Sequence, residues 1–422
     1  MVAIAGDPLT GLKRAHCTFI HLTIFVAVLS LGPVPARAAS KHSGRAARVQ
    51  TGLDVLESQK FAPLRGKHIG LITNHTGLDS QGRSTVDLLS HAPGVQLIAL
   101  FSPEHGLAGR NDEKISSSND PATGLPVHSL YGETLRPTDE MLKGIDTLVF
   151  DVQDAGVRFY TYTTTMAYCM EEAAKHNIAF FVLDRPNPLG GQIVEGPMLD
   201  ADKTSFVGYF PLPVRYGLTI GELAQLFNAE NHIGADLHVI TMKNWHRNYF
   251  FESTGLKWIP PSPNLRTTKG SILYPGIEIL QNAGVSVGRG TETPFEELGA
   301  PWLNGDDVAV ALNERHLPGL HFAAKPFIPI VGLYSGQRCG GVAIRITDRA
   351  AVRSIRTGIE IAAILLKLDP KQFDPEKLLL LMGNSDTIRQ LQSGTPPEEI
   401  VASWSTALTA FDQIRRKYFL YK

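Results

Sequence analysis

Short apolar runs alternate with helix-like segments along the first two thirds of the chain. The apolar runs are typical of buried strands and cover residues 68–73, 95–101, 147–152, 178–184 and 237–242, with a further candidate at 284–288. Helices are expected between the strands, at residues 84–91, 137–142, 164–176 and 219–228. Apolar strands that alternate with helices predict an α/β fold, with a Rossmann-like, mostly parallel sheet and helices on both faces.

The pattern changes after about residue 300. A helix is expected at residues 306–314, strands at 327–331 and 341–347, and helices at 350–368 and 398–418. The 422 residues are enough for two hydrophobic cores. We therefore expect a Rossmann-like catalytic domain at residues 52–300 and a smaller C-terminal α+β domain at 301–422. A cleft between two such domains is a common place for a ligand.

The first residues have the layout of a secretory signal. Lys13 and Arg14 precede an apolar run at 19–31, and a small-residue cleavage site follows at 36–38. The run is shorter than the roughly 20 apolar residues of a membrane-spanning helix. We expect a signal peptide at residues 1–38 and a flexible lead-in at 39–51. The mature protein is then periplasmic or secreted, without a stable membrane span; the alternative is an uncleaved anchor.

Charge and motif content exclude several kinds of partner. The 40 basic and 41 acidic residues form no basic stripe, so nucleic-acid binding is not expected. After signal cleavage only Cys169 and Cys339 remain, which is not a disulfide framework. No CxxC or HExxH motif indicates a metal site, and no GxGxxG follows a strand. We therefore expect neither a metal nor a nucleotide cofactor.

Polar residues gather after four of the expected strands. In a parallel sheet these strand ends meet at one edge, where ligands bind in open α/β folds. The residues are Asn74 and His75 after the first strand, Glu104 and His105 after the second, Asp151, Asp154, Arg158, Tyr160 and Tyr162 after the third, and Arg185 after the fourth. This convergence is stronger evidence for a site than any single motif.

Glu104 is the leading candidate for a catalytic acid. Pro103 and Gly106 bracket the Glu104–His105 pair, which favours a fixed turn over a helix start. Tyr160 and Tyr162 alternate along the chain, so we expect one of them to face the core and the other to face the site.

The remaining charged candidates each have a structural alternative. Asp151 is more typical of a structural ligand of backbone amides, and Arg185, beside two prolines, could simply hold its loop through a carboxylate. Arg158 and Arg289 could each clamp an anionic group through two hydrogen bonds, or form an internal ion pair.

Two later loops contribute polar residues to the same list. The rigid loop at 261–265 carries Asn264, and the glycine-containing loop at 288–295 carries Arg289 and Glu292. The second loop is not a phosphate-binding loop, because no GKS or GKT sequence follows its glycines.

These segments together resemble a known family. The segments SPEHG, DVQDAGVRFYTY, DRPNPLGG, VEGPML, TIGELA, PPSPNL and GRGTETPFEELGAPW resemble those of the bacterial exo-β-N-acetylmuramidases of the NamZ type, in the same order. The resemblance runs from about residue 52 to the C-terminus. It implies a glycoside hydrolase of cell-wall recovery that releases N-acetylmuramic acid from the non-reducing end of peptidoglycan fragments. It also implies a site between the two domains and places the candidate catalytic glutamate at Glu104.

Glycoside hydrolysis requires a carboxylic acid near the leaving oxygen, a role that suits Glu104. The second catalytic group would be Asp154, Glu292 or the acetamido oxygen of the substrate. In the last case, His105, Tyr160 or Tyr162 would orient the acetamido group. Muramic acid carries a lactyl carboxylate, for which Arg158 and Arg289 are the candidate partners. The other expected substrate-binding residues are Asn74, His75, Arg185 and Asn264.

Two other functions are compatible with the sequence. A metal-dependent hydrolase could use His75, His105, Asp151 and Asp154 as ligands. A wall-binding protein without catalytic activity would bind peptidoglycan fragments and release no sugar. The sequence leaves open the anomeric outcome, the acceptance of peptide-bearing muramic acid and the oligomeric state.

Overall fold

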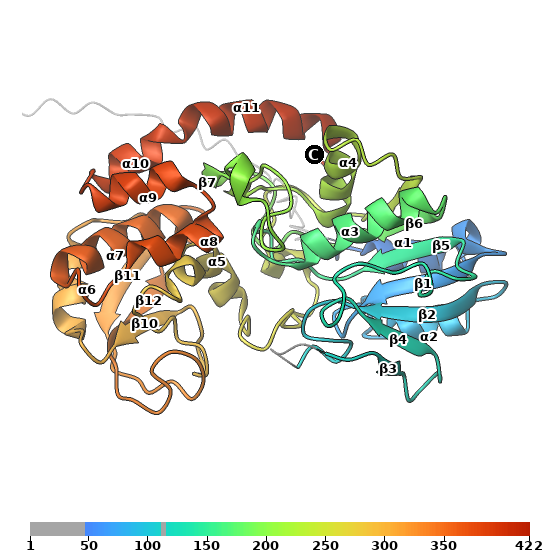
Figure 1. Ribbon diagram of the computed structural model, residues 1–422, viewed down its shortest axis with the longest axis horizontal. Coiled ribbons are helices and arrows are strands. Elements are labelled where there is room, and N and C mark those ends of the chain that lie inside the picture. Colours follow the sequence, from blue (N-terminus) through green and yellow to red (C-terminus); the bar gives the residue numbers. More distant parts are fainter. Residues whose placement is uncertain (1–46, 111–114) are drawn as a thin grey trace, which may run out of the picture. The chain divides into compact units, whose positions relative to one another are not determined.

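A seven-stranded sheet forms the centre of the computed structural model, which describes residues 47–110 and 115–422 (Figure 1). Neighbouring strands run parallel except for the antiparallel pair β3–β4. The strand order is β3 (Ser118–Asn119), β4 (Pro126–Ser129), β2 (Gln96–Ser102), β1 (His68–Thr73), β5 (Thr147–Asp151), β6 (Ala179–Leu183) and β9 (Leu237–Ile240). The predicted mostly parallel α/β fold is confirmed.

The strand order reverses direction between β1 and β5. From β1 the chain adds β2 and β4 on one side, and it then returns to add β5, β6 and β9 on the other side. At such a switch point the loops after adjacent strands separate, which opens a crevice at the carboxyl ends of the strands. The polar loops identified in the sequence follow β1, β2, β5 and β6 and so lie at this edge.

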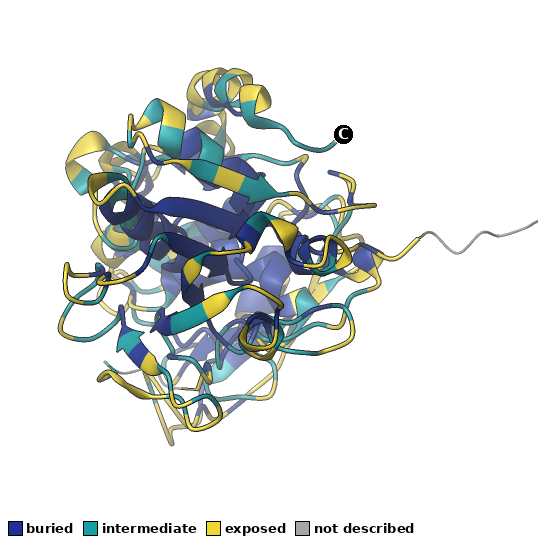
Figure 2. Cartoon of the chain, turned by 90° about the vertical axis from the view of Figure 1, so that its right-hand side faces the viewer, coloured by how far each residue is buried: buried dark blue, intermediate teal, exposed yellow. Residues whose placement is uncertain are grey.

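Helices cover both faces of the sheet, as predicted. One face is covered by α1 (Gly52–Ser58) and α2 (Thr85–Ser90), whose leucines pack against alternate strand residues. The other is covered by α3 (Tyr162–Lys175) and α4 (Ile220–Glu230). In Figure 1, α3 and α4 lie above the strands of this sheet. Figure 2 shows the central strands as buried, which explains why they are apolar on both faces.

The start of α4 shows how local sequence fixes an element. The Thr219 hydroxyl accepts from the Glu222 amide at 3.2 Å, and the Glu222 carboxylate accepts from the Thr219 amide at 3.0 Å. This reciprocal pair is the capping box that the sequence predicts.

A second, antiparallel sheet belongs to the C-terminal part of the chain. Its order is β10 (Glu297–Ala300), β12 (Gly340–Ile346) and β11 (Leu320–Ala324). Helix α6 (Gly305–Asn313) packs on its strands, α7 (Ser354–Leu368) packs on α6, and α5 (Thr268–Ile277) packs on α7. Because β10 precedes residue 301, this sheet draws on both sides of the predicted domain boundary.

The remaining elements connect the two sheets. A two-stranded sheet pairs β7 (Glu195–Met198) with β8 (Pro213–Arg215). The chain ends in α8 (Leu379–Met382), α9 (Ser385–Gln392), α10 (Pro397–Ser403) and α11 (Ser405–Arg415). The Arg415 guanidinium at the end of α11 donates to the carbonyls of Gly191, Gln192 and Gly217 at 2.7–3.1 Å, which ties the C-terminal helix to loops that flank the first sheet.

Two predicted strands are wrong. Residues 284–288 make only a single bridge, Ser286 to Gly299, because Gly284 and Gly288 adopt left-handed φ angles of 96° and 77° at its two ends. Residues 327–331 make only the bridge from Phe327 to Cys339, since Pro329 has no amide hydrogen with which to continue a ladder.

The predicted helices also need correction. Residues 137–142 form one turn, closed by the bond from the Leu142 amide to the Thr138 carbonyl at 3.1 Å, and Gly144 (φ 78°) follows it. The expected helix at 398–418 is broken at Trp404, whose indole donates to the Thr387 hydroxyl of α9 at 3.1 Å. The helix expected from residue 350 begins at Ser354, after a turn at 348–351.

The predicted signal peptide, residues 1–38, and most of the lead-in lie outside the described residues. The last residues of the predicted flexible lead-in are instead fixed, because the Val49 amide donates to the Thr254 carbonyl and Gln50 pairs with Lys243. Within residues 47–110 and 115–422, no helix has both the length and the apolarity needed to cross a membrane.

Candidate active site

Glu104 lies in a tight loop that follows β2. The Gly106 amide donates to the Pro103 carbonyl at 3.0 Å, and the Gly109 amide donates to the Gly106 carbonyl at 3.1 Å. His105 itself has a left-handed φ of 68°, which is costly for a side chain with a Cβ. Backbone strain of this kind persists where the surroundings fix the loop, and it is frequent at functional sites. The predicted fixed turn is present.

The Glu104 carboxylate is held from the segment after β5, two strands away in the sheet. The Thr161 hydroxyl, at the start of α3, donates to Glu104 Oε2. The Tyr162 hydroxyl lies 3.4 Å from the Glu104 carbonyl oxygen. The loops after β2 and β5 therefore meet at Glu104, as the parallel sheet requires.

Three phenols surround this carboxylate. The rings of Tyr160 and Tyr162 contact edge to face with centroids 4.8 Å apart, and Tyr274 of α5 lies 6.0 Å from Tyr160. Burial raises the pKa of all three phenols, and the Glu104 charge raises each pKa further. The hydroxyls thus stay protonated beside Glu104. Tyr160 and Tyr162 are both buried, and which of them faces the site stays a prediction.

Asn74 and His75 connect the loop after β1 to the loop at 260–262. The Asn74 amide donates to the Tyr162 hydroxyl at 3.1 Å, and that hydroxyl lies 2.7 Å from the Pro261 carbonyl. His75 Nε2 is 2.7 Å from the Pro260 carbonyl.

The loop that carries Glu104 also packs on His75. A Cβ at Gly109 would come within 1.9 Å of the His75 ring. Burial lowers the pKa of His75, and the nearby His105 and Arg110 lower it further, so His75 is neutral at pH 7.

Asp154 is a buried carboxylate in the loop after β5. Its Oδ2 accepts from the Gly156 amide at 2.7 Å and from the Tyr216 hydroxyl, whereas the buried Oδ1 has no partner among the described residues. Burial raises the pKa of Asp154 to about 6. The charges of Asp154 and Glu104 both raise the pKa of Tyr160, which places this phenol near both carboxylates.

Two of the predicted substrate-binding arginines have internal partners. Arg158 is 1 % exposed, and its terminal nitrogens donate to four carbonyl oxygens, those of Pro197, Leu212, Leu381 and Met382. Arg185 binds Asp151 through two nitrogens, at 2.5 and 2.8 Å. The structure therefore uses Arg158 to join distant segments, and it uses Arg185 to hold its loop through a carboxylate, which was the predicted alternative.

Asp151 is not a ligand of backbone amides, contrary to the prediction. Its carboxylate accepts from Arg185 and from the Thr85 hydroxyl of α2. Asp151 is fully buried at the end of β5. Its partners come from the loop after β6 and from the start of α2, and not from the turn that follows β5.

The predicted site residues of the loops at 261–265 and 288–295 differ in burial. The buried Asn264 accepts from the Gly290 amide at 3.4 Å, which joins the two loops. Arg289 pairs with Glu278, and its side chain is 30 % exposed. The Arg289 guanidinium lies 5.8 Å from the Phe295 ring, which contacts Tyr274 edge to face at 4.8 Å. Arg289 therefore lies at the rim of the group formed by Glu104, Thr161, Tyr160, Tyr162 and Tyr274, called here the Glu104 cluster. Glu292 is exposed.

The four residues proposed as ligands of a metal-dependent hydrolase do not form a ligand set. Within the described part of the chain, no three His, Cys, Asp or Glu residues are arranged to hold a metal ion. Asp151 is saturated by Arg185 and Thr85, and the remaining residues therefore present no group of three carboxylate and imidazole donors.

Sequence reasoning missed three residues of the candidate site. Thr161 lies inside the polar run that the sequence identified and could have been chosen for its position between the two tyrosines. Tyr216 and Tyr274 come from segments with no polar pattern of their own, and only the fold brings them to Asp154 and Tyr160.

Comparison with known proteins assigns the chain to a family. Two family models match, the N-terminal part of exo-β-N-acetylmuramidase NamZ over residues 69–269 and its C-terminal part over residues 272–421. The peptidoglycan β-N-acetylmuramidase NamZ of Bacillus subtilis (strain 168) is 42 % identical over 411 residues, which cover 94 % of this chain and 99 % of the relative.

Two crystal structures of DUF1343 family proteins from Bacteroides fragilis NCTC 9343 are similar in fold. One has a TM-score of 0.84 and 39 % identity, and the other a TM-score of 0.75 and 30 % identity. Each comparison covers 89 % of this chain and 99 % of the other chain. The family models, the relative and the shared fold together establish that this chain belongs to the exo-β-N-acetylmuramidase NamZ family.

Proposed function

We propose that this protein is an exo-acting glycoside hydrolase that releases N-acetylmuramic acid from the non-reducing end of peptidoglycan fragments. Membership of the NamZ family supports the reaction and the substrate class. The observation that carries the proposal is the placement of Glu104 at the carboxyl edge of the sheet, where its carboxylate accepts from Thr161 and the Tyr162 hydroxyl lies 3.4 Å from its carbonyl oxygen.

Glu104 acts as the general acid in this proposal. Cleavage of a glycosidic bond requires a proton on the leaving oxygen as the bond to the anomeric carbon breaks. The Thr161 hydroxyl fixes Oε2, and Oε1 has no hydrogen-bond partner among the described residues. Oε1 is therefore the oxygen that carries the proton to the leaving group.

Asp154 is the protein group best placed to assist. Its Oδ1 is buried without a partner among the described residues, and Tyr160 lies near both Asp154 and Glu104. Glu292 is exposed and is the weaker choice. The third candidate is the acetamido oxygen of the substrate, which would attack the anomeric carbon while Asp154 or a phenol orients the amide.

Arg289 is the cation that we assign to the lactyl carboxylate of muramic acid. Its partial exposure and its position at the rim of the Glu104 cluster support this role. Arg158 is withdrawn as a candidate, because its terminal nitrogens already donate to four carbonyl oxygens.

The proposal is tested by incubating the protein with a disaccharide of N-acetylmuramic acid β-linked to N-acetylglucosamine and following the products by proton NMR. We expect both free sugars. Initial appearance of the β-anomer indicates retention, through the acetamido oxygen or a carboxylate nucleophile, and the α-anomer indicates inversion. Binding of the disaccharide without release of either sugar contradicts the proposed activity and favours a wall-binding protein.

A further inference from the structure

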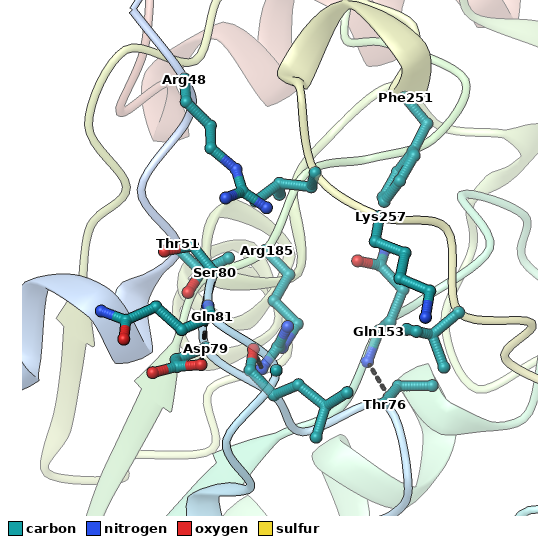
Figure 3. Close-up of a pocket in the computed structure, with 14 residues that line it drawn as sticks. Arg48, Thr51, Thr76, Asp79, Ser80, Gln81, Gln153, Arg185, Phe251 and Lys257 are labelled. Carbon is teal, nitrogen blue, oxygen red and sulfur yellow. Dashed lines mark hydrogen bonds between the residues drawn. The ribbon is translucent and has the colours of Figure 1, made fainter.

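A separate pocket of about 340 Å³ lies at the point where the strand order reverses. Its lining includes Thr76 from the loop after β1, Gln153 from the loop after β5 and Arg185 from the loop after β6. It therefore occupies the carboxyl ends of three adjacent strands, the place where open α/β sheets bind ligands. Figure 3 shows this pocket with the side chains that line it.

Two exposed cations of the pocket have no charged partner in the described part of the chain. Arg48 and Lys257 line it from opposite sides (Figure 3), and neither side chain has a hydrogen bond or ion pair among the described residues. The other charged groups of the lining are neutralised. Arg185 binds Asp151, and Asp79 binds Arg83 and the amides of residues 81 and 83.

The pocket also has an apolar wall. Phe251, Leu256 and Ile259 line it beside the two cations, and Thr76 and Gln153 supply polar atoms. Two free positive charges next to an apolar surface suit a ligand with a carboxylate at one end and a less polar body. The volume is within the range of about 300–1,000 Å³ typical of small-molecule pockets, at its lower end.

The pocket is distinct from the Glu104 cluster. None of Glu104, Tyr160 and Tyr162 lines it. The two are nevertheless connected, because the Thr76 hydroxyl donates to Asn74 Oδ1 at 2.6 Å and the Asn74 amide donates to the Tyr162 hydroxyl at 3.1 Å.

We propose that this pocket binds a small organic acid, with the carboxylate between Arg48 and Lys257 and the body of the molecule against Phe251. A carboxylate on a sugar and a carboxylate on a short peptide share the required chemistry. The proposal does not depend on the catalytic role of Glu104, because it rests on the charge and the place of the pocket alone.

The test measures binding by isothermal titration calorimetry in a Glu104→Gln background, which prevents turnover. The probes are N-acetylmuramic acid, an N-acetylmuramoyl dipeptide whose only carboxylate is on the peptide, and the neutral N-acetylglucosamine. The pocket variant is Arg48→Gln with Lys257→Gln. The control is Arg65→Gln with Lys371→Gln, which removes two exposed positive charges outside the pocket. Both variants keep the same Glu104 cluster, so any binding of a probe there contributes equally to both measured affinities.

We expect the pocket variant to bind at least one acid about tenfold more weakly than the control, which corresponds to about 1.4 kcal/mol. A loss for N-acetylmuramic acid identifies the sugar carboxylate as the ligand group, and a loss for the dipeptide alone identifies the peptide carboxylate. N-acetylglucosamine should bind equally to both variants. Equal affinities of the two variants for both acids overturn the proposal, whatever the disaccharide experiment shows.

Discussion

At the scale of single residues, the carboxylates of the strand edge differ in how many of their oxygens have a hydrogen-bond partner. Both oxygens of Asp151 are bonded to Arg185, and one also accepts from Thr85. Glu104 and Asp154 each keep one oxygen without a hydrogen bond among the described residues. A buried acceptor without a partner, such as Asp154 Oδ1, is costly unless a ligand or water satisfies it, whereas Glu104 is only half-buried. Glu104 and Asp154 are therefore the two acids available for chemistry.

A prediction at this scale concerns Arg289. We expect Arg289→Met to reduce kcat/KM for a chromogenic β-N-acetylmuraminide about tenfold or more, because a charge-assisted hydrogen bond to the lactyl carboxylate is lost. The matching glucosaminide lacks the lactyl group, so its kcat/KM should change little. The ratio of the two values is the readout, since it cancels any loss of folded protein that follows from removing the Arg289–Glu278 ion pair. An unchanged ratio excludes Arg289 from recognition of the lactyl group.

At the scale of elements, one buried ion pair holds three strand ends together. Asp151 ends β5, Arg185 follows β6, and the Arg185 guanidinium also donates to the Leu78 carbonyl in the loop after β1, at 3.0 Å. The Thr85 hydroxyl brings the start of α2 to the same carboxylate. This cluster sets the spacing of the loops that carry Asn74, Asp154 and the wall of the pocket.

The Arg185–Asp151 pair gives a stability prediction. Arg185→Met should lower the free energy of unfolding by about 3–5 kcal/mol, because it leaves a buried carboxylate without its cation. Arg185→Met combined with Asp151→Leu removes both charges and should lose less. Urea unfolding followed by circular dichroism measures both variants. If the single variant is as stable as the parent, or the double variant is less stable than the single one, the pair does not have this role.

At the scale of the whole molecule, a raised carboxyl pKa makes stability depend on pH. The pKa of Asp154 is about 6 in the folded protein because of burial, against about 3.9 for an unfolded chain. The folded state then binds the proton more tightly, so this contribution to stability is fully present below pH ~4 and is lost as pH rises through ~6.

Asp154→Asn removes the titrating carboxyl group, and with it the loss of folding stability as pH rises. Relative to the parent, the variant should gain stability between pH 4 and pH 7 by about 3 kcal/mol at most, which is the equivalent of roughly two pKa units. Unfolding free energies at four pH values across this range give the trend. Asp307→Asn, at an exposed position of α6, controls for the loss of one negative charge. A stability difference that is flat with pH shows that Asp154 does not titrate near 6.

The sequence predicts the central sheet well because its signal is local. Apolar runs mark β5 and β6, which are buried along their whole length, and β1 and β2, which are buried toward their C-terminal ends. The run at the edge strand β9 is also apolar, although that strand is only partly buried. The errors lie where backbone details decide the outcome. Residues 284–288 have a strand-like pattern, but the left-handed glycines at both ends limit them to one bridge.

The sequence predicts which loops form the candidate site, but not all of the contacts within it. Parallel strands bring their loops to one edge, so the meeting of Asn74, Tyr162 and Glu104 follows from the strand order. The role of Arg158 does not follow, because its carbonyl partners Leu381 and Met382 lie more than 200 residues away in the sequence. Nor could periodicity reveal Tyr216 as the donor to Asp154, because a single phenol leaves no pattern.

The most direct test of the central claim compares two substrates of Glu104→Gln. The 2,4-dinitrophenyl β-N-acetylmuraminide releases a stable anion that needs no proton, whereas the natural disaccharide needs protonation of its leaving oxygen. Removal of a general acid should therefore lower first-turnover cleavage of the disaccharide about 10²–10⁴-fold and leave release of dinitrophenolate within about tenfold of the parent. Equal losses on both substrates, or near-normal cleavage of the disaccharide, would contradict the assignment of Glu104 as the acid.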